Sequence, residues 1–233
     1  MNLFFTPPDR VGEKELLIEG QESSHLVKVL RHRQGDLVQV TDGSGNLFQG
    51  SIISARSDST RVTILSRETK QKRSPSITMC IGMIRKRDRL EYAVEKVTEI
   101  GADRIYLFHG DHSEKAGLRI DRLESAALSA MKQSLSCWLP VISHFKNLKQ
   151  AVEQGDETAV LIAADETISG FDGCYSVTQS ENFTLVVGPE GGLSEAERNY
   201  LKSRDAGFIS LGANRLRTET AAAVMCDRFR NRC

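Results

Sequence analysis

A glycine-rich loop with a carboxylate at its centre is the first stretch of the sequence that suggests chemistry. The residues LVVGPEGGLSEAE, at 185–197, lead from a short apolar run into the start of a helix, where Ser194 and Glu197 have the spacing of a capping box. Loops of this kind usually cradle phosphate with backbone N–H groups, often with a lysine close by. Here Glu190 stands in the loop and a lysine does not, and the spacing fits neither the Walker pattern nor GxGxxG. A phosphate-free, positively charged ligand therefore suits the loop better.

S-Adenosylmethionine is a ligand of that kind. Its adenine, ribose and methionyl parts use backbone donors and acceptors, while its sulfonium is cationic. We therefore expect this cofactor beside the loop. The sequence leaves a plainer interpretation open, in which the glycines only turn the chain and Glu190 caps a helix or pairs with an arginine.

A second motif, SLGANRLRTETAAA at 210–223, carries both an arginine and a carboxylate. We expect Thr218 or Thr220 to cap the helix that follows, and the three alanines to let that helix pack closely against its neighbours. Arg217 and Glu219 therefore stand at the entrance of a helix. They either form a local ion pair that holds the loop or act on a substrate.

Together, GPEGGLSEAE and LGANRLRTETA resemble the RsmE-type 16S ribosomal RNA uridine-N3 methyltransferases of the SPOUT superfamily. Further similar stretches are EKVTEIG at 95–101, MKQS at 131–134 with Pro140 downstream, and HLVKVLR at 25–31 followed by Gly35 and Asp36. The resemblance covers essentially the whole chain. It has departures: Asn214 and Arg215 stand where a basic and an aliphatic residue are usual, and Ser136 stands where an arginine often occurs.

The resemblance implies an α/β fold, with a SPOUT-type domain that has a parallel sheet and a C-terminal trefoil knot, preceded by a small PUA-like β-barrel domain. It also implies a homodimer that binds S-adenosylmethionine in a bent form within the knotted loops. The cofactor-binding positions carried over to this chain are Leu161, Ala163, Gly188, Pro189, Glu190, Gly191, Gly192, Leu211, Gly212, Leu216, Thr220 and Ala221. Glu190 is then expected near the cationic ligand.

Methylation of uridine at N3 requires the imide proton to leave. The enzyme has to align N3 with the methyl group and stabilise negative charge on the flanking carbonyl oxygens. By position and chemical type, we expect Arg217 to stabilise that charge or hold the substrate, and Glu219 to accept the proton. The reaction needs no metal.

The expected partner is 16S ribosomal RNA within the small ribosomal subunit. The candidate RNA-binding residues are His25, Lys28, Arg31, Arg33, Lys72, Arg73 and Arg85. For the group near 25–33, a solvated helix face is the competing interpretation. The cofactor loops also fit a SPOUT enzyme that methylates another nucleotide of ribosomal or transfer RNA, and a ribosome-assembly protein that binds RNA without catalysis.

The elements that position these motifs fall into two regions. Residues 1–69 show short alternating runs that predict a small, mostly β domain with a hairpin over 36–53. Its one helix is expected to begin at Ser23 and to bury Leu26, Val29 and Leu30. Residues 70–75 lack apolar periodicity and are expected to be a linker. The remainder, 76–233, is predicted to be a parallel sheet covered on both faces, because continuous apolar strands alternate with helices. The predicted strands are 77–83, 104–108, 159–163 and 184–187, and the helices include 89–100 and 119–135.

Composition limits the partners that the chain can have. The 31 basic and 31 acidic residues cancel, so an RNA-binding surface has to be local. Basic residues gather at 70–89 and again from Arg215 to Arg232. These stretches either converge on a polyanion or form a solvated linker and tail. We expect a cytoplasmic protein without a membrane partner, because no signal peptide and no stretch of roughly 20 apolar residues is present. The cysteines form no CxxC pair, and His109, Asp111 and His112 lack a further convincing ligand, so no metal site is expected.

Overall fold

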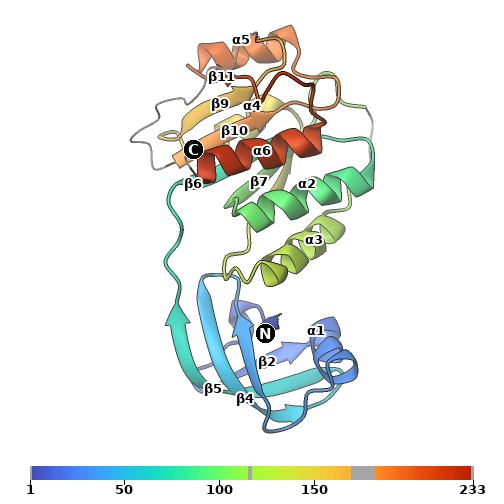
Figure 1. Ribbon diagram of the computed structural model, residues 1–233, viewed down its shortest axis with the longest axis vertical. Helices are drawn as coiled ribbons and strands as arrows, with labels where there is room; N and C mark the ends of the chain where they lie inside the picture. Colours follow the sequence, from blue (N-terminus) through green and yellow to red (C-terminus); the bar gives the residue numbers. More distant parts are fainter. Residues whose placement is uncertain (1, 115–116, 169–181, 232–233) are drawn as a thin grey trace. The chain divides into compact units, whose positions relative to one another are not determined.

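Figure 1 shows the computed structural model of the chain, in which residues 2–114, 117–168 and 182–231 are described. The chain forms two compact units: Met1–Lys72 with Met131–Leu139, and Arg73–Ala130 with Pro140–Cys233. The segment Met131–Leu139 therefore belongs to the first unit. The expected domains, 1–69 and 76–233, assigned this segment to the second domain instead. Among the described helices, none has the length and apolar character needed to cross a membrane.

The first unit is built on a five-stranded sheet with the order β1-β3-β4-β5-β2. Its strands are β1 (Leu3–Phe5), β2 (Glu15–Glu19), β3 (Leu37–Thr41), β4 (Asn46–Ala55) and β5 (Ser59–Thr69). β1 and β3 are parallel, and the other pairs are antiparallel. The alternating residues of the sequence bury one side of the strands, so that Val40, Phe48 and Val62 become fully buried. The hairpin predicted over 36–53 is β3–β4.

The predicted helix of the first unit is wrong in its start and in one buried position. The structure has α1 (Gly20–Ser24) followed by the π-helical turn η2 (His25–Val29). Ser23 does not cap the helix, because its hydroxyl donates to the carbonyl of Arg56 at 2.7 Å. The wider π turn changes the residue spacing on each face. As a result Leu26 is fully buried as expected, whereas Val29 is 63% exposed.

The segment Met131–Leu139 packs on the turn between β3 and β4. Gly45 donates its N–H to the carbonyl of Cys137 at 2.8 Å, and Leu139 donates to the carbonyl of Gly43 at 2.9 Å. Trp138 lies so close to Gly45 that an added Cβ would come within 2.2 Å of the indole ring. Only glycine leaves room for the tryptophan here, which explains why the turn GSGN contains Gly45.

The second unit is a six-stranded parallel sheet with the order β11-β9-β10-β6-β7-β8. Its strands are β6 (Ser76–Gly82), β7 (Arg104–Phe108), β8 (Val141–Phe145), β9 (Val160–Ala164), β10 (Asn182–Val187) and β11 (Gly207–Ile209). The helices that follow them are α2 (Arg87–Ile100), α3 (Ile120–Gln133), α4 (Leu148–Glu153), α5 (Glu195–Ser203) and α6 (Thr218–Asn231). The four predicted strands are confirmed to within two residues. β8, β11 and α4 were not predicted.

Helices cover both faces of this sheet, as the continuous apolar strands predict. On one face α2 and α6 pack together (Figure 1). There Phe229 of α6 contacts Phe183 of β10, with ring centres 5.1 Å apart. On the other face α4 contributes Leu148 to a buried cluster with Cys80 and Val186. Burial on both sides explains why the strands in the middle of the sheet are mainly apolar.

Candidate functional site

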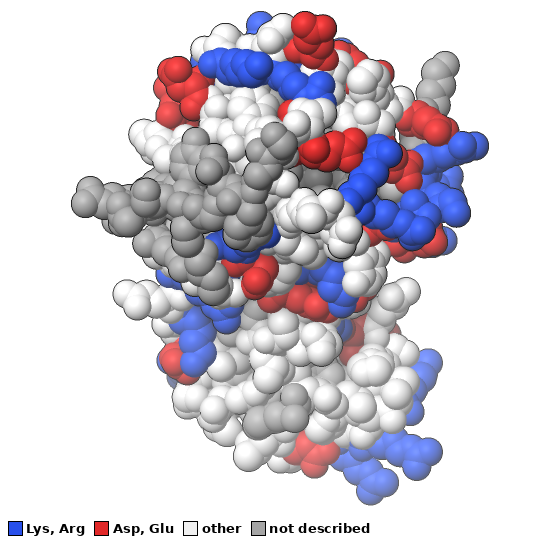
Figure 2. Space-filling view, turned by 45° about the horizontal axis from the view of Figure 1, so that its top comes forward, with Lys and Arg blue, Asp and Glu red and all other residues white. Residues whose placement is uncertain are grey.

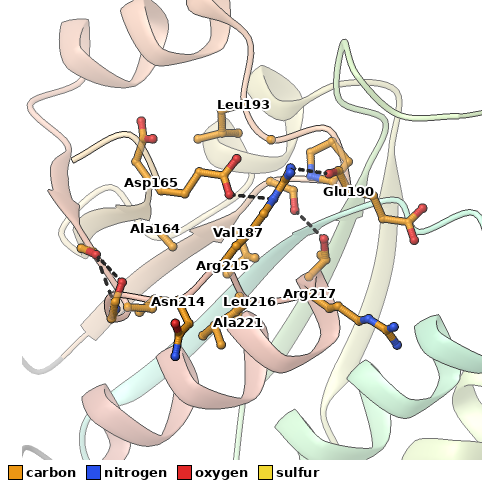
Figure 3. Close-up of a pocket in the computed structure, with 18 of the residues that line it drawn as sticks. Ala164, Asp165, Val187, Glu190, Leu193, Asn214, Arg215, Leu216, Arg217 and Ala221 are labelled. Carbon is orange, nitrogen blue, oxygen red and sulfur yellow. Dashed lines mark hydrogen bonds and ion pairs between the residues drawn. The ribbon is translucent and has the colours of Figure 1, made fainter. Parts of the chain in front are cut away.

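The loops at the carboxyl ends of β9 and β10 form a pocket together with the segment that leads from β11 to α6. β11, β9 and β10 are neighbours in the sheet, so these segments meet at one edge although they are far apart in sequence. The cavity between them has a volume of about 690 Å³. It is lined mainly by 164–166, 187–190, 192–193 and 210–218 (Figure 3). The two motifs of the sequence therefore face one another across a single pocket.

The GPEGG loop is held from its outer side by the loop that follows β7. The predicted capping box is confirmed: Ser194 accepts from the N–H of Glu197 at 3.1 Å, and the Glu197 carboxylate accepts from the N–H of Ser194 at 2.8 Å. The Ser194 hydroxyl donates to Asp111 at 2.5 Å, and His112 Nδ1 lies 3.1 Å from the carbonyl of Gly191. Within the described part of the chain no cluster of three metal-ligating side chains occurs. Asp111 and His112 instead brace the loop.

Glu190 pairs with an arginine. Its carboxylate accepts from Arg89 Nη1 at 3.0 Å, and Figure 3 shows its side chain directed away from Ala164 and Val187. Arg89 also lies 3.6 Å, through Nε, from a carboxylate oxygen of Glu219. One guanidinium on α2 thus links the two motifs. The contacts of Glu190 therefore match the plainer interpretation of the sequence, in which this residue pairs with an arginine.

Arg217 and Glu219 do not form the local ion pair that the sequence allowed. Glu219 is only 6% exposed, does not line the cavity, and has Arg89 as its charged partner. Its Oε2 atom is buried without a hydrogen bond among the described residues. Arg217 lines the cavity and is exposed, and its guanidinium makes no hydrogen bond or ion pair within the described part of the chain. Among the arginines that line the pocket, Arg217 is therefore the one without a partner among the described residues.

The backbone of the second motif is held by hydrogen bonds from other elements. Arg228 of α6 donates to the carbonyls of Ser210 and Leu211, both at 3.1 Å. Thr218 donates to the carbonyl of Gly188 at 3.2 Å, which ties the start of α6 to the GPEGG loop. These bonds fix the positions of both loops before any ligand arrives.

The loop after β9 contributes two carboxylates to the pocket. Asp165 is almost fully buried and accepts from Arg198 Nε at 2.7 Å and from both the N–H and the hydroxyl of Thr167. Burial alone would raise the pKa of Asp165, but the hydrogen bonds from Arg198 and Thr167 outweigh burial and hold that pKa below its usual value. The next residue, Glu166, forms an exposed ion pair with Arg215 at 2.9 Å.

Comparison with known proteins places this pocket in a known type of domain. The model of the RNA methyltransferase domain matches residues 71–230, and that of the RNA methyltransferase PUA domain matches residues 18–65. The chain belongs to the RNA methyltransferase family. The pocket lies entirely within the matched methyltransferase domain. The five-stranded sheet lies largely within the region matched as the PUA domain. The α/β fold with an amino-terminal PUA domain is thereby confirmed.

Several relatives carry a more specific name. The chain is 28% identical over 217 residues to the ribosomal RNA small subunit methyltransferase E of Bacillus subtilis, which covers 88% of this chain and 85% of that protein. A probable rRNA-methyltransferase from Porphyromonas gingivalis is 32% identical, with a TM-score of 0.85 and 99% of each chain covered. The methyltransferase E of Neisseria gonorrhoeae, solved bound to S-adenosyl methionine, has the same fold, with a TM-score of 0.81 at 22% identity over 99% of this chain and 97% of that chain.

The pocket of this RNA methyltransferase domain contains most, but not all, of the residues expected to bind cofactor. Those that line it are Gly188, Pro189, Glu190, Gly192, Leu211, Gly212, Leu216 and Ala221. Leu161, Ala163, Gly191 and Thr220 do not line it. Leu161 and Ala163 lie on β9 before Ala164, where the lining of this segment begins, and Ala163 is part of the core. Gly191 faces His112.

Sequence reasoning missed several charged residues of the pocket. Arg89, Asp165, Glu166, Arg198 and Arg215 all line it. Asp165 and Glu166 directly follow the apolar run of β9, and polar residues at the end of a parallel strand are a signal that was available. Arg89 and Arg198 come from helices, and local pattern gives no sign that they reach the pocket.

The expected RNA-binding residues are distributed over both units. His25, Lys28, Arg31 and Arg33 of the first unit are all exposed, as is Arg73. Lys72 lies over the Trp138 ring, with Nζ 5.5 Å from its centre, and Arg85 pairs with Glu114 at 2.8 Å. In the view of Figure 2, basic and acidic side chains are interspersed over the surface, in keeping with the zero net charge.

Two arginines of the basic carboxyl-terminal stretch do not belong to the solvated tail that the sequence allowed. Arg228 donates to backbone carbonyls beside the pocket. Arg230 is buried, pairs with Asp103 at 3.0 Å, and donates to the carbonyls of Pro75 and Gly101. Both arginines hold the second unit together, and Arg232 lies outside the described residues.

Proposed function

We propose that the protein transfers a methyl group from S-adenosylmethionine to N3 of a uridine in 16S ribosomal RNA of the small ribosomal subunit. The observation that carries the proposal is the pocket itself. Two motifs typical of RsmE-type enzymes, separated by about twenty residues, meet at one edge of the sheet inside the methyltransferase domain. Relatives named ribosomal RNA small subunit methyltransferase E support the ribosomal substrate.

The lining of the pocket fits the cofactor. Among the described residues that line it, none is a lysine, while Val187, Leu193 and Leu216 provide apolar surface. Gly192 and Gly212 have positive φ angles of 74° and 142°, and a Cβ on Gly212 would meet nothing within 4 Å, so the backbone there is open to a ligand. The Neisseria gonorrhoeae enzyme, which has this fold, is bound to S-adenosyl methionine. When bound, the cofactor supplies a methyl group activated by a cationic sulfur.

We assign Arg217 to the acceptor base. Loss of the imide proton leaves negative charge on the two carbonyl oxygens that flank N3, and a free guanidinium at the pocket stabilises that charge. Arg217 has the required exposure and no partner within the described residues. Proton acceptance by Glu219 stays a prediction. Because Glu219 does not line the cavity and pairs with Arg89, which does, we first assign the Glu219 carboxylate to holding Arg89.

RNA binding is proposed for the exposed basic side chains near 25–33 of the PUA domain, together with those at 72–73 and 85 outside it. We also propose that the enzyme works as a homodimer in the cytoplasm, where ribosomal subunits are assembled, and that it needs no metal. Charge reversal at Lys28 and Arg31 tests the RNA surface. We expect weaker RNA binding with unchanged cofactor binding, since these exposed residues belong to the first unit.

One experiment tests the reaction. The protein is incubated with methyl-labelled S-adenosylmethionine and unmodified small ribosomal subunits, and the labelled nucleoside is identified by mass spectrometry. We expect label in N3-methyluridine of 16S RNA. Label in a ribose, in a guanine or in transfer RNA would contradict the acceptor assignment and support another SPOUT activity. Cofactor binding without any transfer would support the non-catalytic alternative.

A further inference from the structure

Arg215 reaches across the pocket and connects its loops. Its Nε atom lies 2.9 Å from a carboxylate oxygen of Glu166, in the loop after β9. Its Nη2 atom donates to the carbonyl of Glu190, in the loop after β10, at 3.4 Å. Figure 3 shows the side chain extending from the second motif toward both loops. Arg215 and Glu166 both line the cavity, so their charged ends are within reach of a bound molecule.

This ion pair differs from its neighbour in how firmly it is held. The pair of Asp165 and Arg198, with side chains 4% and 26% exposed, is reinforced by Thr167. The side chains of Arg215 and Glu166 are 68% and 49% exposed. Exposed ion pairs contribute little to stability and open readily. The first pair therefore shapes the pocket, whereas the second is free to exchange partners.

Arg215 is also one of the positions at which the chain departs from the family that it resembles. An aliphatic residue is usual there, and an aliphatic side chain makes neither of the contacts that Arg215 makes. Glu166 is the acidic partner in this chain. Together the two residues place one cation and one anion on opposite loops of the pocket.

We propose that Arg215 and Glu166 form the subsite for the amino-acid end of S-adenosylmethionine. That end is a zwitterion, with an α-carboxylate and an α-ammonium group attached to the same carbon. The Arg215 guanidinium donates to the carboxylate, and the Glu166 carboxylate accepts from the ammonium group. One exposed ion pair is replaced by two, so the charges of Arg215 and Glu166 stay paired with and without the ligand. The proposal rests on the cofactor named under the proposed function.

Three ligands separate this subsite from the rest of the pocket. S-Adenosylhomocysteine keeps the zwitterion, decarboxylated S-adenosylmethionine lacks the carboxylate, and 5′-methylthioadenosine lacks the whole amino-acid end. Calorimetry with the full-length protein measures the Kd of each for the wild type, Arg215→Ile and Glu166→Gln. Arg204→Gln, an exposed arginine away from the cavity lining, is the control for loss of a positive charge.

We expect both pocket variants to bind S-adenosylhomocysteine about tenfold more weakly, the loss of roughly one charge-assisted hydrogen bond. They should bind 5′-methylthioadenosine like the wild type. For the decarboxylated ligand, Arg215→Ile should have no effect while Glu166→Gln still weakens binding. The Arg204 control should match the wild type throughout.

Two results would overturn the subsite. One is an unchanged affinity of both variants for S-adenosylhomocysteine. The other is an equal loss of affinity for 5′-methylthioadenosine, which would mean that the pair only maintains the shape of the pocket. If the wild type bound none of the three ligands, the cofactor of the proposed function would be wrong, and the subsite with it. Wild-type binding combined with either of the first two results removes the subsite alone.

Discussion

Gly82, the last residue of β6, controls where the GPEGG loop lies. A Cβ atom at this position would be 2.3 Å from the backbone nitrogen of Pro189, 2.6 Å from its Cδ and 2.8 Å from the carbonyl carbon of Gly188. Favourable contacts between such atoms require roughly 3.5 Å, so Gly82→Ala has to displace the loop by about 1 Å. Two of the three atoms belong to the backbone, and rotation of a side chain cannot relieve the overlap.

The displacement should affect both stability and cofactor binding. Overpacking of one methyl group costs about 1–3 kcal/mol. At about 2–4 °C per kcal/mol for a chain of this size, Tm should fall by roughly 2–12 °C. Because Gly188, Pro189 and Gly192 line the pocket, a shift of about 1 Å should weaken cofactor binding by at least about tenfold. Thermal unfolding followed by circular dichroism and calorimetry with S-adenosylmethionine measure the two effects.

Gly50→Ala provides a matched control. A Cβ on Gly50 would lie 2.3 Å from Val62 Cγ1 and 2.6 Å from the carbonyl oxygen of Thr63, an overlap of similar size within the first unit. This variant should also lose stability, yet below its Tm it should bind the cofactor normally. Normal cofactor binding by Gly82→Ala, or an equal loss of binding in both variants, would refute the argument that Gly82 acts through the loop.

Three other predictions concern charged groups. Arg217→Ala should lower kcat by about 10²–10³-fold in a labelled-methyl assay while the calorimetric Kd of the cofactor stays unchanged, because the free guanidinium acts on the acceptor base; an unchanged kcat would remove Arg217 from the mechanism. Arg230→Met should lower the free energy of unfolding by about 3–5 kcal/mol in urea titrations, since it breaks the buried ion pair with Asp103 and the hydrogen bonds to the carbonyls of Pro75 and Gly101; a loss below about 1 kcal/mol, the scale of an exposed pair, would contradict this. The depressed pKa of Asp165 contributes stability that is present above the pKa of the unfolded state and is lost as the pH falls through the lower folded pKa. Asp165→Asn should therefore flatten the decline in stability with acid, and an identical pH profile would show that the carboxylate is not shifted.

Local pattern predicted the parts of the fold that depend on neighbouring residues. The apolar runs gave β6, β7, β9 and β10, and the spacing of Ser194 and Glu197 gave the start of α5. Position 101 was expected to end α2, and Gly101 indeed has a φ of 109° there. The π-helical turn at His25–Val29 was missed, because its wider spacing produces no helical periodicity that a pattern search would detect.

The contacts that complete the pocket depend on the order of strands in the sheet. β9 pairs with β10 and β11, which brings Glu166 within reach of Arg215 and of the GPEGG loop. Nothing in the spacing of residues states that order, so the ion pairs were not predictable, and the resemblance carried over residues of β9 itself instead of those that follow it. The trefoil knot and the homodimer stay predictions of the resemblance.

The charges around the pocket indicate a different role for Glu190 from the one expected from the sequence, which placed it near a cationic ligand. Four arginines and three carboxylates line the cavity. Each carboxylate is paired: Asp165 with Arg198, Glu166 with Arg215, and Glu190 with Arg89.

Arg217 is then the one lining arginine without a partner in the described chain. A pocket that selected its ligand only by a cationic sulfur would keep a free carboxylate, whereas this one keeps a free cation. A free cation is what the acceptor requires, because uridine becomes anionic as its N3 proton leaves. We therefore propose that Glu190 serves the reaction indirectly, by holding Arg89, and that Arg217 is the unbalanced charge available to the RNA base.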